Sequence, residues 1–511
     1  MGVPLPPEPR WVKLLDQSRC IGCHACTTAC KGENEVPAGV TRTYVKSVDV
    51  GVFPQVRRAF QVTRCNQCED APCVAACPTR AMFRRGDGIV DFDKGICIGC
   101  KACMAACPYD AIFINPEDHS AEKCNMCAHR LDAGLEPACV TVCPTEAILV
   151  GDLNDPTAKV AQVINREPVQ VRRPEKDTRP GVFYKGAHQA TLDPLAARRP
   201  DGGLFAWATQ GTPDPQLVTS GHPGSGPTVS SAAALLSYDV PHHAPWGWRV
   251  SLYTWTKSVA AGGFAVPAAL AFAGILSWEN AAARWATPLL ALAFLALTGG
   301  LLIADLKHPE RFYLIFTRRH WRSWLVRGAV ILGGFGGIVA GYLLAALAGA
   351  TGARQVLAAL GLPLAAAAAV YTAYLFAQAK ARDLWQSPLL PPHLAVQAAL
   401  AGAAAMLPLL AWLAPGHAVA ADEVVLAAAA AAHLLLAAGE ITLPHVTAHA
   451  RLAAEELSRG RYRRPFGISL IFIAVAVAAP WIGTWAVPFA LAGLLAYEHA
   501  YVQAGQSVPL A

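Results

Sequence analysis

Sixteen cysteines, all within the first 245 residues of this 511-residue chain, are the side chains best suited to chemistry. They fall into four quartets, and no cysteine is left over. The quartets are Cys20, Cys23, Cys26 and Cys30; Cys65, Cys68, Cys73 and Cys77; Cys97, Cys100, Cys103 and Cys107; and Cys124, Cys127, Cys139 and Cys143. Thiols clustered in this way can bind zinc, form disulfides or ligate iron–sulfur clusters.

The spacing within the quartets favours iron–sulfur clusters. In the first and third quartets, three cysteines are separated by two residues each, and a fourth follows after three more. A tight loop turns three such thiolates toward one [4Fe–4S] cube, and the fourth thiolate ligates a neighbouring cluster. Each quartet then needs a partner, so the repeat predicts two pseudo-symmetric halves with two cubes each. A zinc ribbon needs two C-x-x-C pairs and fits only the fourth quartet taken alone.

The N-terminal segment bears on the disulfide alternative. Residues 1–20 are rich in proline and contain neither an apolar secretory signal nor a twin-arginine motif. An oxidising compartment is therefore not indicated by this segment, and metal ligation is favoured over disulfides.

Three segments resemble the four-cluster ferredoxin subunit of membrane molybdenum oxidoreductases that act on dimethyl sulfoxide, polysulfide, tetrathionate or nitrite. They read "CNQCEDAPCVAACPT", "DGIVDFDKGICIGCKACMAACPY" and "KCNMCAHRLDAGLEPACVTVCPTEAILVGDLND". The resemblance implies that the first quartet pairs with the fourth and the second with the third. The implied ligand sets are Cys20, Cys23, Cys26 with Cys143; Cys30 with Cys124, Cys127, Cys139; Cys65, Cys68, Cys73 with Cys107; and Cys97, Cys100, Cys103 with Cys77. No cysteine is replaced, so we expect four [4Fe–4S] clusters. In this interpretation residues 1–191 form an α+β double ferredoxin-like domain.

The composition changes completely after a Pro-, Gly- and Ser-rich linker predicted over residues 192–245. Residues 246–511 are dominated by Ala, Leu, Val and Gly and form a predicted membrane domain. They contain eight apolar stretches near the ~20 residues that span hydrocarbon, so we expect an all-α eight-helix transmembrane bundle. The stretches are approximately 250–276, 285–304, 324–349, 355–378, 394–414, 422–439, 466–483 and 485–503.

The charge distribution predicts how the bundle lies in the membrane. Residues 1–245 hold 25 Lys and Arg against 26 Asp and Glu, so the net charge of +6 belongs to the apolar half. This pattern suits loops at a membrane surface and argues against a nucleic-acid partner. Twelve basic residues lie in alternate loops: Lys307, Arg311, Arg318, Arg319, Arg322, Lys380, Arg382, Arg451, Arg459, Arg461, Arg463 and Arg464. The opposite loops hold only Arg284 and Arg354.

This bias predicts that both termini, and hence the ferredoxin domain, face the cytoplasm from an inner membrane. The alternative is a periplasmic face, reached if a partner that bears a signal sequence carries the folded domain across.

The apolar half resembles the membrane subunit of polysulfide reductase, the NrfD family. The similar stretches are "WGWRVSLYTWTKSVAAGGF", "LLIADLKHPERF", "YTAYLFAQAKARDLWQSPLLPPH" and "YEHAYVQAGQSVPL". The resemblance implies a quinone-reactive membrane anchor that lacks haem and is usually a separate chain. Axial haem ligation would need two deep histidines on facing helices. We expect only His433 to lie deep, and therefore no haem.

Ionisable groups inside the predicted spans suggest a site for menaquinone or ubiquinone. Lys257, Asp305 and His308 are predicted to bind the quinone oxygens or exchange protons with them. Tyr253, Tyr371, Tyr374, Glu440 and His445 are predicted to contribute to the same pocket, and Glu498 and His499 close the last span on the same side. The structural alternative is that Lys257 pairs with a carboxylate to lock two helices and that residues 308–311 cap a loop.

These features together predict an electron-transfer and membrane-anchor subunit. It would link the quinone pool to a separate molybdenum or tungsten pterin catalytic subunit, because this chain has no pterin-binding domain and no site for a terminal substrate. Sulfur oxyanions, polysulfide, formate, nitrite and sulfoxides all remain possible terminal substrates. The alternatives are a quinone-coupled proton pump, with Glu440, Glu498 and Arg327 in the proton path, and a purely structural anchor.

Overall fold

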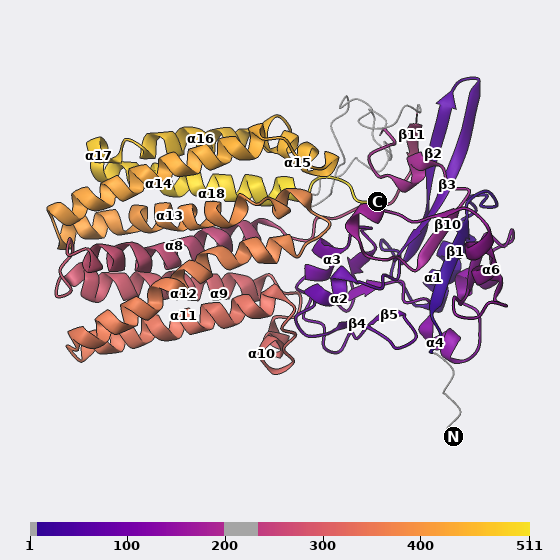
Figure 1. Cartoon of the computed structure of the whole chain (residues 1–511), viewed down its shortest axis with the longest axis horizontal. Helices are drawn as coiled ribbons and strands as arrows, with labels where there is room; N and C mark the ends of the chain where they lie inside the picture. The colour runs from indigo at the N-terminus through magenta and orange to yellow at the C-terminus, as the bar shows by residue number, and fades with distance from the viewer. Residues whose placement is uncertain (1–7, 199–233) are drawn as a thin grey trace.

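The structure is a computed structural model that describes residues 8–198 and 234–511. Short strands and helices form an N-terminal domain, and long helices form a bundle beside it (Figure 1). The N-terminal helices are α1 Ala25–Glu33, α2 Pro72–Ala76, α3 Ala102–Ala106, α4 Ala128–Asp132, α5 Ala138–Thr141, α6 Lys159–Arg166 and α7 Gln189–Leu192. Helix α3 lies at the end of the N-terminal domain that faces the bundle (Figure 1).

The strands of the N-terminal domain form four small sheets. They are β1 Trp11–Asp16, β2 Thr43–Val52, β3 Gln55–Arg64, β4 Met82–Arg84, β5 Val90–Phe92, β6 Ile112–Ile114, β7 Ala121–Lys123, β8 Ile148–Asp152, β9 Val169–Gln170, β10 Val182–Lys185 and β11 Ala234–Tyr238. The sheet orders are β8-β1-β10-β9, β11-β2-β3, β4-β5 and β6-β7. Strands β4 and β5 form a hairpin and pair on either side of the turn that contains Asp87 and Gly88.

The short helices pair in the same way as the cysteine quartets were predicted to pair. Helix α1 contacts α5, and α2 contacts α3. Each pair joins segments that lie in different quartets, so cysteines far apart in the sequence approach one another.

The predicted irregular linker ends in an ordered strand. Residues 234–238 form β11, which pairs antiparallel with β2, and most of the predicted linker lies outside the described residues. Arg198 forms a β-bridge with Leu235 of β11, and the chain enters the bundle after β11.

The bundle consists of two groups of four long helices that lie against each other (Figure 1). The first group is α8 Trp248–Phe272, α9 Thr287–Ala304, α11 Trp324–Leu347 and α12 Thr351–Ala377; the second is α13 Leu390–Leu413, α14 His417–Thr442, α16 Arg463–Ala476 and α18 Ala486–Gly505. Shorter helices are α10 Leu314–Thr317, α15 Ala448–Ser458 and α17 Ala479–Ile482, with a π-helical turn over Ala282–Ala286 before α9.

The two groups meet where glycines remove side chains from the contact. A Cβ added to Gly262 on α8 would lie 1.7 Å from the carbonyl oxygen of Ala398 on α13. Such close backbone approach is typical of membrane helices, where small residues allow van der Waals packing.

Six segments of the described chain are long and apolar enough to cross a membrane, judged by length and composition. They are Ala282–Ala304, Trp324–Leu347, Thr351–Ala377, Leu390–Leu413, His417–Thr442 and Ala479–Gly505. Eight spans were predicted. The two helices outside this set are α8, which carries Arg249, Lys257 and several hydroxyl side chains, and α16, which has only 14 residues.

A buried histidine attaches the chain that enters α8 to the N-terminal domain. Nδ1 of His242 lies 2.6 Å from Asp110 Oδ2, and Nε2 lies 3.1 Å from Asp239 Oδ1. Burial alone would lower the pKa of this imidazole, but hydrogen bonds and charge from the two carboxylates raise its pKa to about 9. The edge of the Tyr44 ring covers the imidazole, and Arg382 is the cation that acts on Asp110. His242 is therefore a cation at neutral pH.

We expect this attachment to weaken as the pH rises. Because the folded pKa lies above the ordinary value of 6.5, the stabilisation is complete below pH 6.5 and is lost as the pH rises to about 9. The difference in pKa corresponds to about 3 kcal/mol. Hydrogen exchange of the β11 amides, corrected for intrinsic rates, should show protection that falls across this pH range. A His242→Gln variant should show low protection with no such fall, and equal protection of the wild type from pH 6 to 9 would contradict the prediction.

Candidate metal centres and membrane cavity

The sixteen thiols lie in four groups, and the thiols within each group interact electrostatically with one another. Each group takes three cysteines from one quartet and one from another. Group 1 is Cys20, Cys23, Cys26 and Cys143; group 2 is Cys30, Cys124, Cys127 and Cys139; group 3 is Cys65, Cys68, Cys73 and Cys107; group 4 is Cys77, Cys97, Cys100 and Cys103. Among residues 8–198 and 234–511, no three Cys, His, Asp or Glu side chains converge as closely as a single metal ion requires.

Left-handed residues between the cysteines produce the sharp loops around each group. His24, Gln67, Lys101 and Met126 all have positive φ angles, between 46° and 63°. Backbone amides at the ends of these loops point at sulfur: the N–H of Ala147 donates to Cys143 Sγ at 3.2 Å, and that of Met82 donates to Cys77 Sγ at 3.3 Å. Amide donors of this kind stabilise anionic sulfur.

Buried cations accompany the thiols. Nη1 of Arg64 lies 3.2 Å from Cys139 Sγ, and Nζ of Lys13 lies 3.7 Å from it. Burial raises the pKa of the Cys139 thiol, but these two cations lower it to about 7. Nε and Nη2 of Arg64 are buried without a hydrogen-bond partner. A buried cation needs an anionic partner, so this part of the molecule fits thiolates that hold a negatively charged group such as an iron–sulfur cluster.

The four groups form a row. Cys26 of group 1 interacts with Cys139 of group 2, and Cys124 of group 2 with Cys65 of group 3. The row continues from group 3 to group 4, because Cys73 interacts with Cys103. Cys23 in group 1 is exposed to solvent.

The other end of the row opens on a cavity of about 550 Å³ in the first helix group. Cys100 of group 4 lines this cavity, together with Tyr253 on α8, Tyr371 on α12 and Asp305 at the end of α9. The rest of its wall is almost wholly apolar and comes from α8, α9, α11, α12 and the short α10. An apolar cavity with a few polar groups is the usual form of a site for a small organic molecule.

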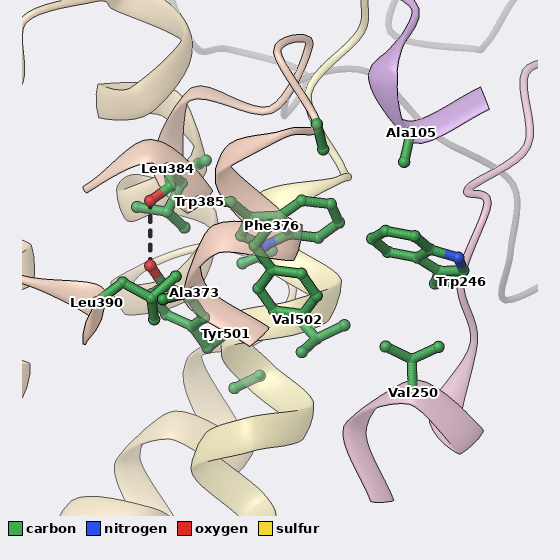
Figure 2. Close-up of a cluster of buried hydrophobic side chains, with 14 of the residues drawn as sticks. Ala105, Trp246, Val250, Ala373, Phe376, Leu384, Trp385, Leu390, Tyr501 and Val502 are labelled. Carbon is green, nitrogen blue, oxygen red and sulfur yellow. Dashed lines mark hydrogen bonds between the residues drawn. The ribbon is translucent and has the colours of Figure 1, made fainter. Parts of the chain in front are cut away.

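Trp246 lies beside Cys100 and forms part of the cavity wall. Figure 2 shows its indole beside Phe376 and Trp385, with ring centroids 5.8 Å and 5.4 Å away. Nε1 of Trp246 donates to the carbonyl oxygen of Cys100 at 3.2 Å. Ala105 from α3 belongs to the same buried cluster (Figure 2), so the two domains share one hydrophobic core.

An ion pair links the cavity directly to the loop of group 4. Oδ2 of Asp305, a cavity residue, lies 2.9 Å from Nζ of Lys101, which follows Cys100 in the chain. Both side chains are largely buried. The charge of Lys101 is therefore held beside both the thiols and the cavity.

The structure brings three predicted quinone-site residues to the cavity: Tyr253, Asp305 and Tyr371. Lys257 lies behind them. Its Nζ is 5.1 Å from the Tyr371 ring centroid and donates to Ala369 O at 2.6 Å and to Thr372 Oγ1 at 2.8 Å.

The remaining predicted residues lie outside the cavity wall. His308 donates from Nε2 to Asp118 O at 2.8 Å, so it contacts the N-terminal domain. Tyr374 is exposed and stacks on Trp324. Glu440, on α14, accepts a hydrogen bond from Ser387 at 3.0 Å, and His445 follows α14 in the second helix group.

A buried polar row in the second helix group was not predicted. Nε2 of His393 on α13 lies 3.0 Å from Nδ1 of His433 on α14, and Nδ1 of His393 lies 3.4 Å from the hydroxyl of Tyr497 on α18. The premise that only His433 lies deep was wrong, since His393 is also buried. The sequence did contain a signal for this burial, because His393 directly precedes the fifth predicted apolar stretch, residues 394–414. In this arrangement the imidazoles contact each other directly.

Comparisons with known proteins agree with this division of the chain. Residues 56–153 match the family model of a 4Fe-4S dicluster domain, and residues 238–482 match that of polysulphide reductase, NrfD. The B subunit of tetrathionate reductase from Salmonella typhimurium is 44% identical over 196 residues, which cover 38% of this chain and 78% of the relative.

Two further relatives match the same N-terminal part. The B polypeptide of polysulfide reductase from Wolinella succinogenes is 42% identical over 171 residues, 33% of this chain and 90% of the relative. Thiosulfate reductase electron transfer subunit PhsB of Salmonella typhi is 48% identical over 149 residues, 29% of this chain and 78% of the relative. With its apolar helices and NrfD domain, the protein is an integral membrane protein. The chain belongs to the family of iron–sulfur electron-transfer subunits of reductases, joined in one polypeptide to a membrane domain of the NrfD polysulphide reductase family.

Proposed function

We propose that this protein carries electrons between membrane quinone and a separate catalytic subunit. The observation that carries the proposal is the continuous row of thiol groups that begins at the exposed Cys23 and ends at the cavity lined by Cys100. Thiol groups 1 to 4 would hold one [4Fe–4S] cluster each, in two ferredoxin-like halves. Such a cluster takes up and releases one electron at a time.

The cavity is suited to a menaquinone or ubiquinone head group. Its wall is apolar, and the buried Tyr253 hydroxyl, which has no partner in the described chain, can hydrogen-bond a ring oxygen. The Asp305 carboxylate can accept a proton. Oxidation of one quinol gives two electrons, which leave through group 4, and two protons, which pass to the chain and to water. The reverse flow reduces a quinone.

The catalytic partner would dock at the far end of the row. Exposed Cys23 and the exposed Ile21 beside it mark the surface where group 1 is accessible. The relatives are named as subunits of tetrathionate, polysulfide and thiosulfate reductases, which supports a molybdenum or tungsten pterin enzyme as the partner.

The proposed setting is a cytoplasmic membrane with eight spans, of which α8 and α16 are the two less apolar. The basic loops between the predicted spans support an orientation with the N-terminal domain in the cytoplasm. A periplasmic face would follow if a signal-bearing partner carried the domain across.

A leucine in place of Gly333 tests the cavity. Gly333 lines it, and a Cβ added there would meet nothing within 4 Å, so the new side chain can enter the space without disturbing the helix. A clash with the head group costs about 1–3 kcal/mol. We therefore expect Gly333→Leu to weaken binding of a short-tailed menaquinol analogue about tenfold or more.

Gly334→Leu is the matched control. Gly334 also has open space around it but does not line the cavity. Wild type and both variants should retain about sixteen iron atoms per chain. Equal quinol binding by the two variants would contradict the assignment of this cavity. The quinone would then bind elsewhere, or the bundle would be a purely structural anchor.

Removal of the buried guanidinium at group 2 tests the cluster assignment. Arg64→Met removes a charged hydrogen bond to Cys139, worth about 1.5–3 kcal/mol, or about 65–130 mV for a one-electron couple. The midpoint potential of the group 2 cluster should fall by this amount in a titration followed by visible absorbance, with a smaller fall at group 1, because Arg64 also interacts with Cys26. Arg80→Met, at an exposed arginine, should leave all midpoints unchanged. No change in Arg64→Met would mean that group 2 holds no cluster.

The buried polar groups favour proton exchange between the cavity and the side of the bundle that faces the N-terminal domain as a second candidate function. Glu498 interacts electrostatically with Lys257, which lies behind the cavity. The phenol of Tyr497 interacts with the carboxylates of both Glu498 and Glu440, and Tyr497 also contacts His393. Buried ionisable groups in a membrane domain are costly and commonly mark ion or proton paths. A proton could therefore pass from the cavity side toward Glu440.

Glu498→Gln tests this path. In vesicles that contain the full chain, with quinol as donor and ferricyanide as acceptor, proton release should slow about tenfold or more, because positioned acid–base groups contribute 10²–10⁴-fold. Glu498→Asp should restore the rate, and Glu455→Gln, at an exposed carboxylate, should leave it unchanged. Release at the normal rate from Glu498→Gln would remove Glu498 from any proton path.

A further inference from the structure

The membrane domain donates hydrogen bonds to the peptide backbone of three of the four cysteines in group 4. Nε1 of Trp246 donates to Cys100 O at 3.2 Å, Nη1 of Arg311 to Cys97 O at 3.0 Å, and Nδ1 of His320 to Cys77 O at 2.9 Å. These donors come from two segments of the membrane domain: Trp246 precedes α8, and Arg311 and His320 lie in the connection between α9 and α11. The contacts therefore enclose the group from several sides.

Further contacts fix the same two loops. The hydroxyl of Ser323 donates to Ala76 O at 2.8 Å, and the amide of His308 donates to Ile98 O at 3.2 Å. Gly99 has a positive φ angle, and a Cβ there would lie only 2.4 Å from Cβ of Lys307. The membrane domain is thus in direct contact with the ligand loops of this group.

Groups 1 to 3 differ, since the donors recorded at their sulfur atoms come from the N-terminal domain itself. In group 2, for example, Lys13, Asn34 and Arg64 are these donors within the described chain. Group 3 also has a membrane-domain neighbour, since Arg382 interacts electrostatically with Cys107. Among the described residues, however, the cysteine carbonyls that accept hydrogen bonds from membrane-domain side chains are those of group 4. Two backbone amides of the N-terminal domain also donate to its sulfur atoms: Ala121 N to Cys97 Sγ at 3.4 Å and Met82 N to Cys77 Sγ at 3.3 Å.

We propose that Trp246, Arg311 and His320 are positioning residues that raise the reduction potential of the cluster in group 4, which makes the membrane domain part of that cluster's site. This proposal rests on the proposed function in one respect, namely that group 4 holds a cluster.

The sign follows from electrostatics. Reduction adds one negative charge to a cluster, and donors and cations nearby stabilise the added charge. Hydrogen bonds to the carbonyls of the ligand residues draw electron density from the loop, and the guanidinium of Arg311 adds a full positive charge. Loss of these groups therefore lowers the potential.

Arg311→Gln and Trp246→Phe separate charge from hydrogen bonding. Arg311→Gln removes the charge and keeps an amide donor, whereas Trp246→Phe removes one donor and keeps an aromatic ring against Phe376 and Trp385. Arg318→Gln is the matched control, because Arg318 is an exposed arginine of the same loop. Each variant is made in the full chain with its clusters and titrated against potential by electron paramagnetic resonance.

The expected result is a downward shift of one midpoint out of four in both variants, larger in the Arg311→Gln and Trp246→Phe double variant, with Arg318→Gln unchanged. Hydrogen exchange of residues 96–101 should rise in the same variants. Four unchanged midpoints in the double variant, with intact spectra, would overturn the proposal. The outcome is separable from quinone binding: a shifted midpoint in a protein that binds no quinol would leave this inference standing and remove the proposed function.

Discussion

The close approach of the residue 97–103 loop to the membrane helices is the constraint on which the rest of the structure depends. In the proposed function, an electron can leave a quinol in the cavity only if a redox group lies within a short distance of it. Small residues make this possible: Gly99 has no side chain between the loop and Lys307, and Ala105 and Ala106 of α3 are fully buried against the membrane domain. The aromatic cluster of Trp246, Phe376 and Trp385 fills the remaining space and excludes water. The seam is therefore a packed core rather than a wet interface between two domains.

Buried charges are stabilised in different ways in the N-terminal domain and in the membrane bundle. In the N-terminal domain, buried Arg64 and Lys13 surround sulfur atoms, so each cation has an anionic neighbour. In the bundle, ionisable groups such as Lys257 and Glu498 are few and lie inside the helix packing, away from lipid. The same physical rule, that an isolated buried charge is unstable, gives a dense ionic core in one domain and a sparse polar row in the other.

The sequence predicted what depends on local spacing. Cysteine spacing and the apolar stretches each reflect neighbouring residues along the chain, and the short helices pair as the cysteine quartets were predicted to pair. Tyr253 and Asp305 were assigned to one predicted pocket, and both line the cavity. Spacing along a helix could not give the rotation of one helix against another, so Lys257 was expected at the cavity but lies behind Tyr371. Trp246 precedes the first predicted span and gains its position only from contacts between domains.

Strand β11 connects the two domains in a way that bears on how the chain could be divided into two polypeptides. By covalent connection this strand belongs to the membrane half, yet in space it completes a sheet of the other half by pairing with β2. Two separately expressed polypeptides divided between residues 198 and 234 would thus carry complementary edges, and strand addition could reunite them. The peptide connection then serves mainly to join one N-terminal domain to each membrane domain in a fixed 1:1 ratio. Separately encoded subunits must reach this ratio by mass action.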